Sequence, residues 1–371
     1  MTILSIKVGS FSGIEIRLHY SWFIIFVLLT YSLATGYLPT GYPGQSNSFY
    51  WGKGAISAAL LFISVLLHEF GHSLVAIYYK VPVKRITLYF LGGVSEIEEE
   101  AHTPGAEFRL AVVGPLISIA LGIIFYGLQI IPSLPLGAIA VFYYSSYINF
   151  VLGAFNLIPA FPMDGGRVFR ALIWTRKDYL YSTKLAVQVS KLLSLGFMTY
   201  GFFTIISSTI FDGFWILLIG FYIYNSAEES MAEAKVSQAL TGVTIAEIMT
   251  RDVHTVEPNL SIQQLVDYQM SKYKHHGFPV TIGEKLIGIV TEEDIRRVEP
   301  ELWDEKRVED IMVPIDKLVT IKPGDAAMDA FIKMAKANVG RLPVVDGEKL
   351  VGIITRSDLL RAVQRRLSIR S

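Results

Sequence analysis

The longest apolar run of this sequence carries ionisable side chains in its middle. Residues 55–79 are almost wholly apolar, and they exceed the roughly 20 residues that a helix needs to cross the hydrocarbon core of a bilayer. The run also contains His68, Glu69 and His72, its only histidines and its only acidic residue. Such groups are costly inside a membrane and mark a functional site by default. The sequence therefore predicts a membrane-spanning helix that shelters a polar centre.

The spacing of the two histidines suits a metal ion. On a helix, His68 and His72 lie one turn apart on the same face, as two imidazole ligands of one Zn²⁺ must. Glu69 beside them is a candidate general base. Because the chain has no cysteine, histidine and carboxylate side chains are the remaining protein ligands for zinc. The competing interpretation, two core histidines with satisfied hydrogen bonds, is disfavoured by the apolar flanks.

A catalytic zinc needs a third protein ligand and an open position for water, and two regions offer a carboxylate. The acidic residues within 96–100 follow His72 on the chain, but the preceding segment 86–94 reads as strand and turn, and a solvated loop is the alternative there. Asp164 follows a helix-ending segment with two prolines, 159–162, and precedes two glycines. Irregular backbone at membrane depth is tolerated only where it is buried or lines a cavity. This favours Asp164 as the third ligand over a turn aspartate.

Six apolar runs are spaced along the first part of the chain. They lie at about 20–37, 55–79, 111–131, 136–158, 192–210 and 214–226. The last run is short, and we expect it to follow a turn at Asp212-Gly213 and to continue helically as far as Glu228. The alternating segment Ile14–His19 predicts a strand at the membrane surface.

Lysine and arginine fall mainly in alternate connections between these predicted spans. The basic residues before the first span, between the second and third, and between the fourth and fifth are Lys7, Arg17, Lys80, Lys84, Arg85, Arg109, Arg167, Arg170, Arg176, Lys177 and Lys184. The other connections contain only Lys53. The positive-inside rule therefore predicts a multi-pass protein of the cell membrane with its N-terminus and C-terminal region in the cytoplasm, which requires an even number of spans.

Composition changes sharply along the chain. Hydrophobic residues make up 52% of the sequence, well above a soluble average, and the excess lies before about Glu228. The polar stretch 226–235 marks the boundary. The formal net charge is +0, so nothing favours a nucleic-acid partner. The first residues lack the charge pattern of a cleavable signal peptide, and we expect none.

The region after this boundary contains an internal repeat. The segment 285–294 recurs at 349–358, and the Met249 and Pro279 neighbourhoods recur at Met312 and Pro343. This period exceeds those of solenoid repeats and indicates a tandem pair of small α/β modules. We therefore expect a polytopic α-helical membrane domain with about six transmembrane helices over residues 1–235, followed by a soluble α/β tandem pair over residues 236–371. The first module is expected at 243–298 and the second at 306–367.

Two motifs together carry a family resemblance. The segment His68-Glu69-Phe70-Gly71-His72, taken with Asn156 through Gly166, resembles the site-2 protease family of intramembrane zinc metalloproteases. The likeness is greatest to archaeal and bacterial members that carry a C-terminal pair of cystathionine β-synthase-type (CBS) modules. Gly114-Pro115-Leu116 and Gly92-Gly93 also look like family features. The resemblance spans essentially the whole chain.

The resemblance implies an intramembrane zinc metalloendopeptidase with one Zn²⁺ per chain. It implies His68, His72 and Asp164 as ligands and Glu69 as the base that activates the metal-bound water. Asn156 is a candidate hydrogen-bond donor to the oxyanion or the substrate peptide, with a helix-packing amide as the equal alternative. The substrates implied are membrane-spanning segments of other proteins within the lipid bilayer.

The paired CBS modules carry a second set of implied residues. The resemblance points to Thr291 with Asp294, and to Thr355 with Asp358, as an adenine-nucleotide site in which the carboxylates accept from ribose hydroxyls. Arg341 is a candidate phosphate contact, with an ordinary surface arginine as the alternative. Because many such modules bind nothing and associate as discs, regulation by nucleotide and homodimerisation through the modules both stay open.

Two other functions compete with proteolysis. A CBS-regulated membrane transporter is disfavoured, because a conduction path needs polar groups on several spans, whereas here they concentrate on one helix and one loop. A catalytically inactive zinc sensor would keep the same ligands, and the sequence does not separate it from an enzyme.

Overall fold

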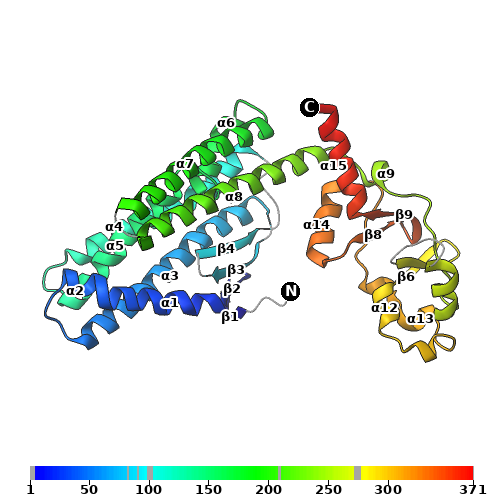
Figure 1. Cartoon of the computed structure of the whole chain (residues 1–371), viewed down its shortest axis with the longest axis horizontal. Coiled ribbons are helices and arrows are strands. Elements are labelled where there is room, and N and C mark those ends of the chain that lie inside the picture. The colour runs from blue at the N-terminus through cyan, green and yellow to red at the C-terminus, as the bar shows by residue number, and fades with distance from the viewer. Residues whose placement is uncertain are drawn as a thin grey trace. The chain divides into compact units, whose positions relative to one another are not determined.

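The chain folds into two compact units, Met1–Ala232 and Glu233–Ser371. The computed structural model describes residues 5–81, 83–89, 92–97, 103–207, 210–270 and 277–370. The helices of the first unit (Figure 1) are α1 (Tyr20–Ser32), η1 (Leu33–Tyr37), α2 (Leu38–Gly41), α3 (Asn47–Tyr78), α4 (Pro104–Gln129), α5 (Leu136–Asn156), α6 (Asp164–Trp174) and α7 (Tyr179–Ser207). Helix α8 (Ile210–Leu240) crosses the boundary between the units.

Five helical segments among the described residues are long and apolar enough to cross a membrane, and all belong to the first unit. They are Tyr20–Gly41, Asn47–Tyr78, Pro104–Gln129, Leu136–Asn156 and Tyr179–Ser207. These segments correspond to the first five predicted spans. The sixth predicted span forms the apolar first half of α8. Helices α3, α4 and α5 contact one another and make the centre of this bundle (Figure 1).

The predicted turn at Asp212-Gly213 is wrong, because both residues lie in the first turn of α8. Gly213 serves helix packing instead. A β-carbon there would lie 2.6 Å from the carbonyl oxygen of Gly201 on α7, and one at Gly201 would lie 2.7 Å from the backbone nitrogen of Leu217 on α8. The two glycines therefore let α7 and α8 approach closely, as small residues do between membrane helices.

A small sheet accompanies the bundle. Its strands, in the order β1-β2-β3-β4, are β1 (Ser5–Phe11), β2 (Ile14–His19), β3 (Val83–Tyr89) and β4 (Gly92–Ile97). Strands β2 and β3 are parallel, whereas β1 and β4 run antiparallel to their neighbours. The strand predicted at Ile14–His19 is confirmed as β2. The strand-and-turn prediction for residues 86–94 matches β3 and the start of β4, which stands at the end of the sheet and contacts α3.

The second unit is an α/β structure built from two repeats. Its strands form one sheet in the order β5-β6-β9-β8, with β7 (Val313–Pro314) added to β6; they are β5 (Gly277–Ile282), β6 (Lys285–Thr291), β8 (Arg341–Asp346) and β9 (Lys349–Thr355). Its helices are α9 (Ile245–Ile248), α10 (Ile262–Gln264), η2 (Leu265–Met270), α12 (Glu292–Arg296), η3 (Pro300–Leu302), α13 (Val308–Ile311), η4 (Ile315–Lys317), α14 (Ala327–Ala337) and α15 (Arg356–Arg370).

The two repeats of the second unit exchange their first segments. Leu240, Val243 and Ile245 precede the first repeat's hairpin, yet they lie in a hydrophobic core with buried residues from 321–363. Val308 begins the second repeat, yet it lies in the core formed by residues 256–295. Each core is therefore completed by a segment that belongs, in sequence order, to the other repeat.

Candidate metal centre

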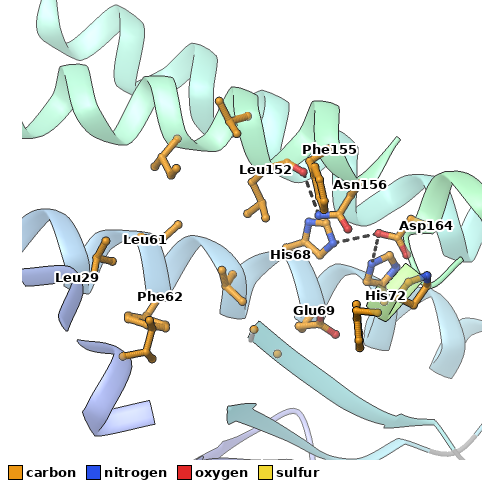
Figure 2. A pocket seen from close by; sticks show the side chains of 18 of the residues that line it. Leu29, Leu61, Phe62, His68, Glu69, His72, Leu152, Phe155, Asn156 and Asp164 are labelled. Carbon is orange, nitrogen blue, oxygen red and sulfur yellow. Dashed lines mark hydrogen bonds and ion pairs between the residues drawn. The ribbon is translucent and has the colours of Figure 1, made fainter. Parts of the chain in front are cut away.

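Three side chains from two distant parts of the chain converge at the centre of the first unit. His68 and His72 project from α3, and Asp164 is the first residue of α6. Asp164 Oδ2 lies 3.1 Å from His68 Nε2 and 3.2 Å from His72 Nε2. Figure 2 shows the two rings and the carboxylate pointing toward one another, and both histidines are buried. Within the described residues, no other group of three His, Cys, Asp or Glu side chains is close enough to hold a metal ion.

Helix α4 fixes which ring nitrogens face this centre. His72 Nδ1 lies 2.6 Å from the carbonyl oxygen of Leu110; because a carbonyl only accepts, Nδ1 carries the proton and Nε2 has a free lone pair. His68 Nδ1 lies 2.9 Å from the hydroxyl of buried Ser118, which allows the same tautomer. Such contacts on the far nitrogen orient histidine ligands of metals.

The backbone of α4 also shapes the space around the ring nitrogens. A β-carbon at Gly114 would lie 2.6 Å from His68 Nε2 and nearer still to His72 Nε2. Any residue larger than glycine would therefore displace the imidazoles. Gly114 stands one turn after Leu110 and one turn before Ser118, so one face of α4 provides all three contacts.

The converging atoms are all hydrogen-bond acceptors when the histidines are neutral. His68 Nε2, His72 Nε2 and an Asp164 oxygen lie within 4.8 Å of one another, and a metal ion or a proton has to lie between them. The distances of 3.1 and 3.2 Å from Asp164 Oδ2 to the two Nε2 atoms match the edge, about 3.3 Å, of a tetrahedron with zinc–ligand distances of ~2.0–2.1 Å. The two-nitrogen, one-oxygen donor set is also one that catalytic zinc sites use. The residues present therefore fit a zinc ion.

Asp164 is held as an anion. Burial raises the pKa of its carboxyl, but when His68 and His72 are protonated at Nε2 they donate to it, more than reverse this effect and lower that pKa to about 2. A turn holds the residue in place, because Met163 N donates to Ala160 O and Gly166 N donates to Met163 O. An ionised carboxylate at neutral pH is the form that binds a metal.

Glu69 lies next to His68 on α3 and faces the same cavity (Figure 2). Its side chain is half-buried. Strand β4 passes directly over it, since a β-carbon at Gly93 would lie 2.5 Å from Glu69 Cγ. The candidate base thus stands between the metal centre and the edge of the sheet.

A cavity of about 690 Å³ contains the metal centre and extends along α1, α3 and α5. Away from the polar end its walls are apolar, formed by Ile25, Leu29, Leu61, Phe62, Val65, Ile148, Val151, Leu152 and Phe155. Asn156 and Arg167 line the polar end. The amide of Asn156 donates to its own helix at Leu152 O, 2.9 Å away (Figure 2), so the alternative role as a helix amide has a partner in the structure.

The nucleotide residues predicted in the second unit cap helices. Thr291 begins α12, where Asp294 Oδ2 accepts from the backbone nitrogen and the hydroxyl of Thr291 at 2.9 and 2.6 Å. Thr355 and Asp358 repeat this pattern before α15, at 2.8 and 2.6 Å. Both carboxylates are buried. The capping box is therefore sufficient to explain why Thr-x-x-Asp occurs in both repeats.

Arg341 connects the neighbourhoods of these two caps. It stands opposite Thr355 in the pairing of β8 with β9, and its Nη1 donates to Gly277 O at 3.1 Å. Gly277 in turn stands opposite Thr291 in the pairing of β5 with β6. The guanidinium of Arg341, in the second repeat, thus contacts the first repeat. Its burial lowers the pKa of the guanidinium.

Comparison with known proteins agrees with this geometry. The family model "Peptidase family M50" matches residues 56–134 and 128–197, and the CBS domain model matches 245–301 and 308–365. A zinc metalloprotease of Methanocaldococcus jannaschii is 34% identical over 359 residues, which cover 97% of this chain and 96% of the relative. This chain belongs to the site-2 protease family.

Another zinc metalloprotease and a solved structure show the extent of the similarity. Rip3 of Mycobacterium tuberculosis is 32% identical over 365 residues, covering 97% of this chain and 93% of the relative. The solved site-2 protease from Methanocaldococcus jannaschii is 34% identical, with a TM-score of 0.42, and covers 61% of this chain and 95% of that one. The present chain is a zinc metalloprotease of the membrane with a C-terminal CBS pair.

Sequence reasoning missed several residues of this site-2 protease centre. Ser118 and the Leu110 carbonyl gave no signal, because a serine in an apolar helix is common and a backbone carbonyl has no side-chain signature. Gly114 was noted only as a family feature. The competing ligands Glu98, Glu99 and Glu100 lie outside the described residues, and the side chain of Glu96 is not described either.

Proposed function

We propose that this protein is an intramembrane endopeptidase that cleaves transmembrane segments of other membrane proteins, with zinc bound by His68, His72 and Asp164. One observation carries the proposal. Asp164 and two histidines of a helix long and apolar enough to cross a membrane bring three ligand atoms within 4.8 Å, and the contacts on the far ring nitrogens turn both Nε2 atoms toward the carboxylate.

Zinc and the chain's own residues have separate roles in the proposed reaction. When bound, zinc supplies a Lewis acid that lowers the pKa of its water and polarises the scissile carbonyl. Glu69 accepts the proton of the attacking water and returns it to the leaving amine. Asn156, at the polar end of the cavity, donates to the substrate carbonyl once its amide turns away from Leu152 O. The buried His72 contact with Leu110 O holds the ring in one orientation throughout.

The cavity suits an unwound apolar segment. A transmembrane helix hides its peptide carbonyls in internal hydrogen bonds, so it has to open before water attacks. The apolar walls contributed by α1, α3 and α5 accept its side chains. Strand β4 ends the sheet, and Gly92 and Gly93 line the cavity, so an extended substrate can pair with this edge.

The proposed topology places the N-terminus and the CBS pair in the cytoplasm of the cell. It rests on the basic connections between the spans, and it requires the first half of α8 to cross the membrane. We assign the membrane protease to residues 1–235 and the CBS pair to 236–371, with modules at 243–298 and 306–367.

The CBS pair is proposed to regulate the protease, either by binding an adenine nucleotide or by forming a homodimer. A nucleotide site would use Thr291, Asp294, Thr355 and Asp358, with Arg341 at the phosphate. The contact of Arg341 with Gly277 O supports a shared site, because it joins the neighbourhoods of the two motifs. Regulation requires that a nucleotide bind the active and inactive forms with different affinities.

The test is cleavage of a purified transmembrane substrate by the full-length protein in detergent. We expect a zinc chelator to stop cleavage and added Zn²⁺ to restore it. A transporter or a zinc sensor would give no cleavage under either condition. Cleavage that a chelator leaves unchanged would refute the metal mechanism.

A further inference from the structure

A buried ion pair links the helix that begins with Asp164 to the helix that orients both histidines. Glu107 stands in the first turn of α4 and is 1% exposed, and Arg170 stands in α6 and is 5% exposed. Arg170 Nε donates to Glu107 Oε1 at 2.7 Å, and its Nη2 donates to the same oxygen. A fully buried pair of this kind costs desolvation and is weak support for stability alone, so its position calls for another explanation.

Glu107 lies on the same face of α4 that contacts the histidines. Residues 107, 110, 114 and 118 follow one another at helical spacing. The last three contact the rings through Leu110 O, the Gly114 backbone and the Ser118 hydroxyl. Glu107 extends this face by one turn, and there it binds α6 instead of α3.

Arg170 is fixed on three sides. Besides Glu107, its guanidinium carbon lies 5.2 Å from the ring centre of Phe161 and 4.8 Å from that of Tyr179. Phe161 belongs to the segment that leads into Asp164, and Tyr179 begins α7. The guanidinium therefore joins α4, α6, α7 and the Asp164 segment through charge and cation–π contacts.

The start of α6 is packed tightly against the segment that precedes Asp164. Arg170 lies six positions after Asp164, or about 9 Å along the helix. The two glycines after Asp164 lie against the backbone of 157–161, so close that a β-carbon at Gly166 would lie 2.7 Å from Phe161 N. A shift of α6 at Arg170 is consequently passed to the carboxylate.

We propose that Glu107 and Arg170 are positioning residues that hold the Asp164 carboxylate in register with His68 and His72. The inference rests on the proposed function, because it assigns a purpose to the ligand set. Arginine suits this role better than lysine, since its planar group presents two N–H donors to one carboxylate oxygen and stacks on aromatic rings.

The experiment compares metal affinity with fold stability in the full-length protein in detergent. Zinc affinity is measured by competition with a chromophoric chelator, and thermal unfolding is followed by circular dichroism with and without zinc. Arg170→Lys keeps the charge but loses the two-point contact. We expect its zinc affinity to fall about 10- to 100-fold, the range for contacts that orient ligands, and the rise in Tm on adding zinc to shrink accordingly.

A second variant tests whether a loss of zinc affinity merely reflects unfolding. Glu107→Met combined with Arg170→Met removes both charges at similar volume, a change that often preserves or raises stability. We expect this double variant to keep the apo Tm while zinc affinity falls as in Arg170→Lys. Arg176→Gln is the matched control, because Arg176 is exposed just after α6; it should retain wild-type affinity.

The outcomes separate this inference from the proposed function. If Asp164→Asn loses zinc but the double variant binds it within twofold of wild type, the ion pair merely holds the fold and the positioning role is refuted. If Asp164→Asn itself binds zinc like wild type, the proposed ligand set fails and the positioning role fails with it.

Discussion

The metal centre and the two CBS motifs both depend on aspartate carboxylates, but these carboxylates have different hydrogen-bond partners. At the metal centre, Asp164 faces His68 and His72 across 3.1 and 3.2 Å, and all three present acceptors to one point. In the CBS pair, Asp294 and Asp358 accept from the threonine three residues before them. The first set needs a metal ion or a proton between its members, whereas the second set is complete without a ligand.

This difference shows how strongly each motif argues for a bound group. Acceptors that converge carry an electrostatic cost unless a proton or a metal ion lies between them. Carboxylates that close a capping box already stabilise their helices. The metal centre therefore supports zinc through its buried ligand set, and the CBS motif becomes an argument for a nucleotide only through measurement.

The largest expected effect comes from removing the carboxylate of the metal centre. Asp164→Asn keeps the size of the side chain but removes its charge, so we expect bound zinc to fall from one ion per chain to almost none and cleavage to stop. Zinc content is measured by atomic emission on the purified protein. Glu96→Gln, which alters the other carboxylate region that the sequence offers, is the matched control. Full zinc and activity in Asp164→Asn, with loss of both in Glu96→Gln, would reverse the assignment.

Glu69→Gln tests the base without touching a ligand. We expect zinc content and the circular dichroism spectrum to stay as in wild type while turnover falls at least ~10²-fold, the usual contribution of a positioned acid–base group. Turnover is followed by the rate of product formation at saturating substrate. A variant that cleaves at nearly the wild-type rate would remove Glu69 from the mechanism.

Ser118→Ala tests whether the Ser118 hydroxyl orients the His68 ring at the metal centre. The hydroxyl contacts His68 Nδ1 at 2.9 Å, and its loss frees the ring to turn, so we expect zinc affinity to drop about 10- to 100-fold. Ser194→Ala is the control, because that buried hydroxyl donates to its own helix at Lys191 O. Equal affinities for the two variants would show that Ser118 has no part in orienting the ligand.

The smallest effect is expected in the CBS pair and tests the other half of the comparison. Asp294→Ala combined with Asp358→Ala opens both capping boxes, and the free energy of unfolding of this unit should fall by about 0.5–2 kcal/mol for each helix. Calorimetry on the full-length protein measures ATP, ADP and AMP binding in parallel. We expect the double variant to lose nucleotide binding with zinc content unchanged. A wild-type protein that binds none of the three would leave these residues with the capping role alone.

The sequence was a good guide where chemistry leaves a residue signature. His68, Glu69 and His72 stand out because charge is rare in an apolar helix, and Asp164 stands out because prolines break the helix before it; the two glycines after it continue into α6. The first five spans are found for the same reason, since a long apolar run has few alternatives.

The contacts that tertiary packing creates were not predictable in this way. Arg170 reads as one of several basic residues in a connection, yet it is buried against Glu107. Gly213 reads as a turn residue beside Asp212, yet its missing side chain serves the approach of α7 to α8. In each case the residue type suggests a common local role, such as a turn or an exposed basic connection. Its packing role becomes visible only when the neighbouring helix is known.

The exchanged segments of the second unit set the order in which this part of the chain can fold during synthesis. Leu240, Val243 and Ile245 leave the ribosome well before residues 321–363, against which they pack. The first repeat alone would also lack Val308. Nascent chains that end between the repeats therefore expose apolar surface, and such surface makes incomplete chains prone to aggregation. Both repeats therefore have to be synthesised before either hydrophobic core is complete.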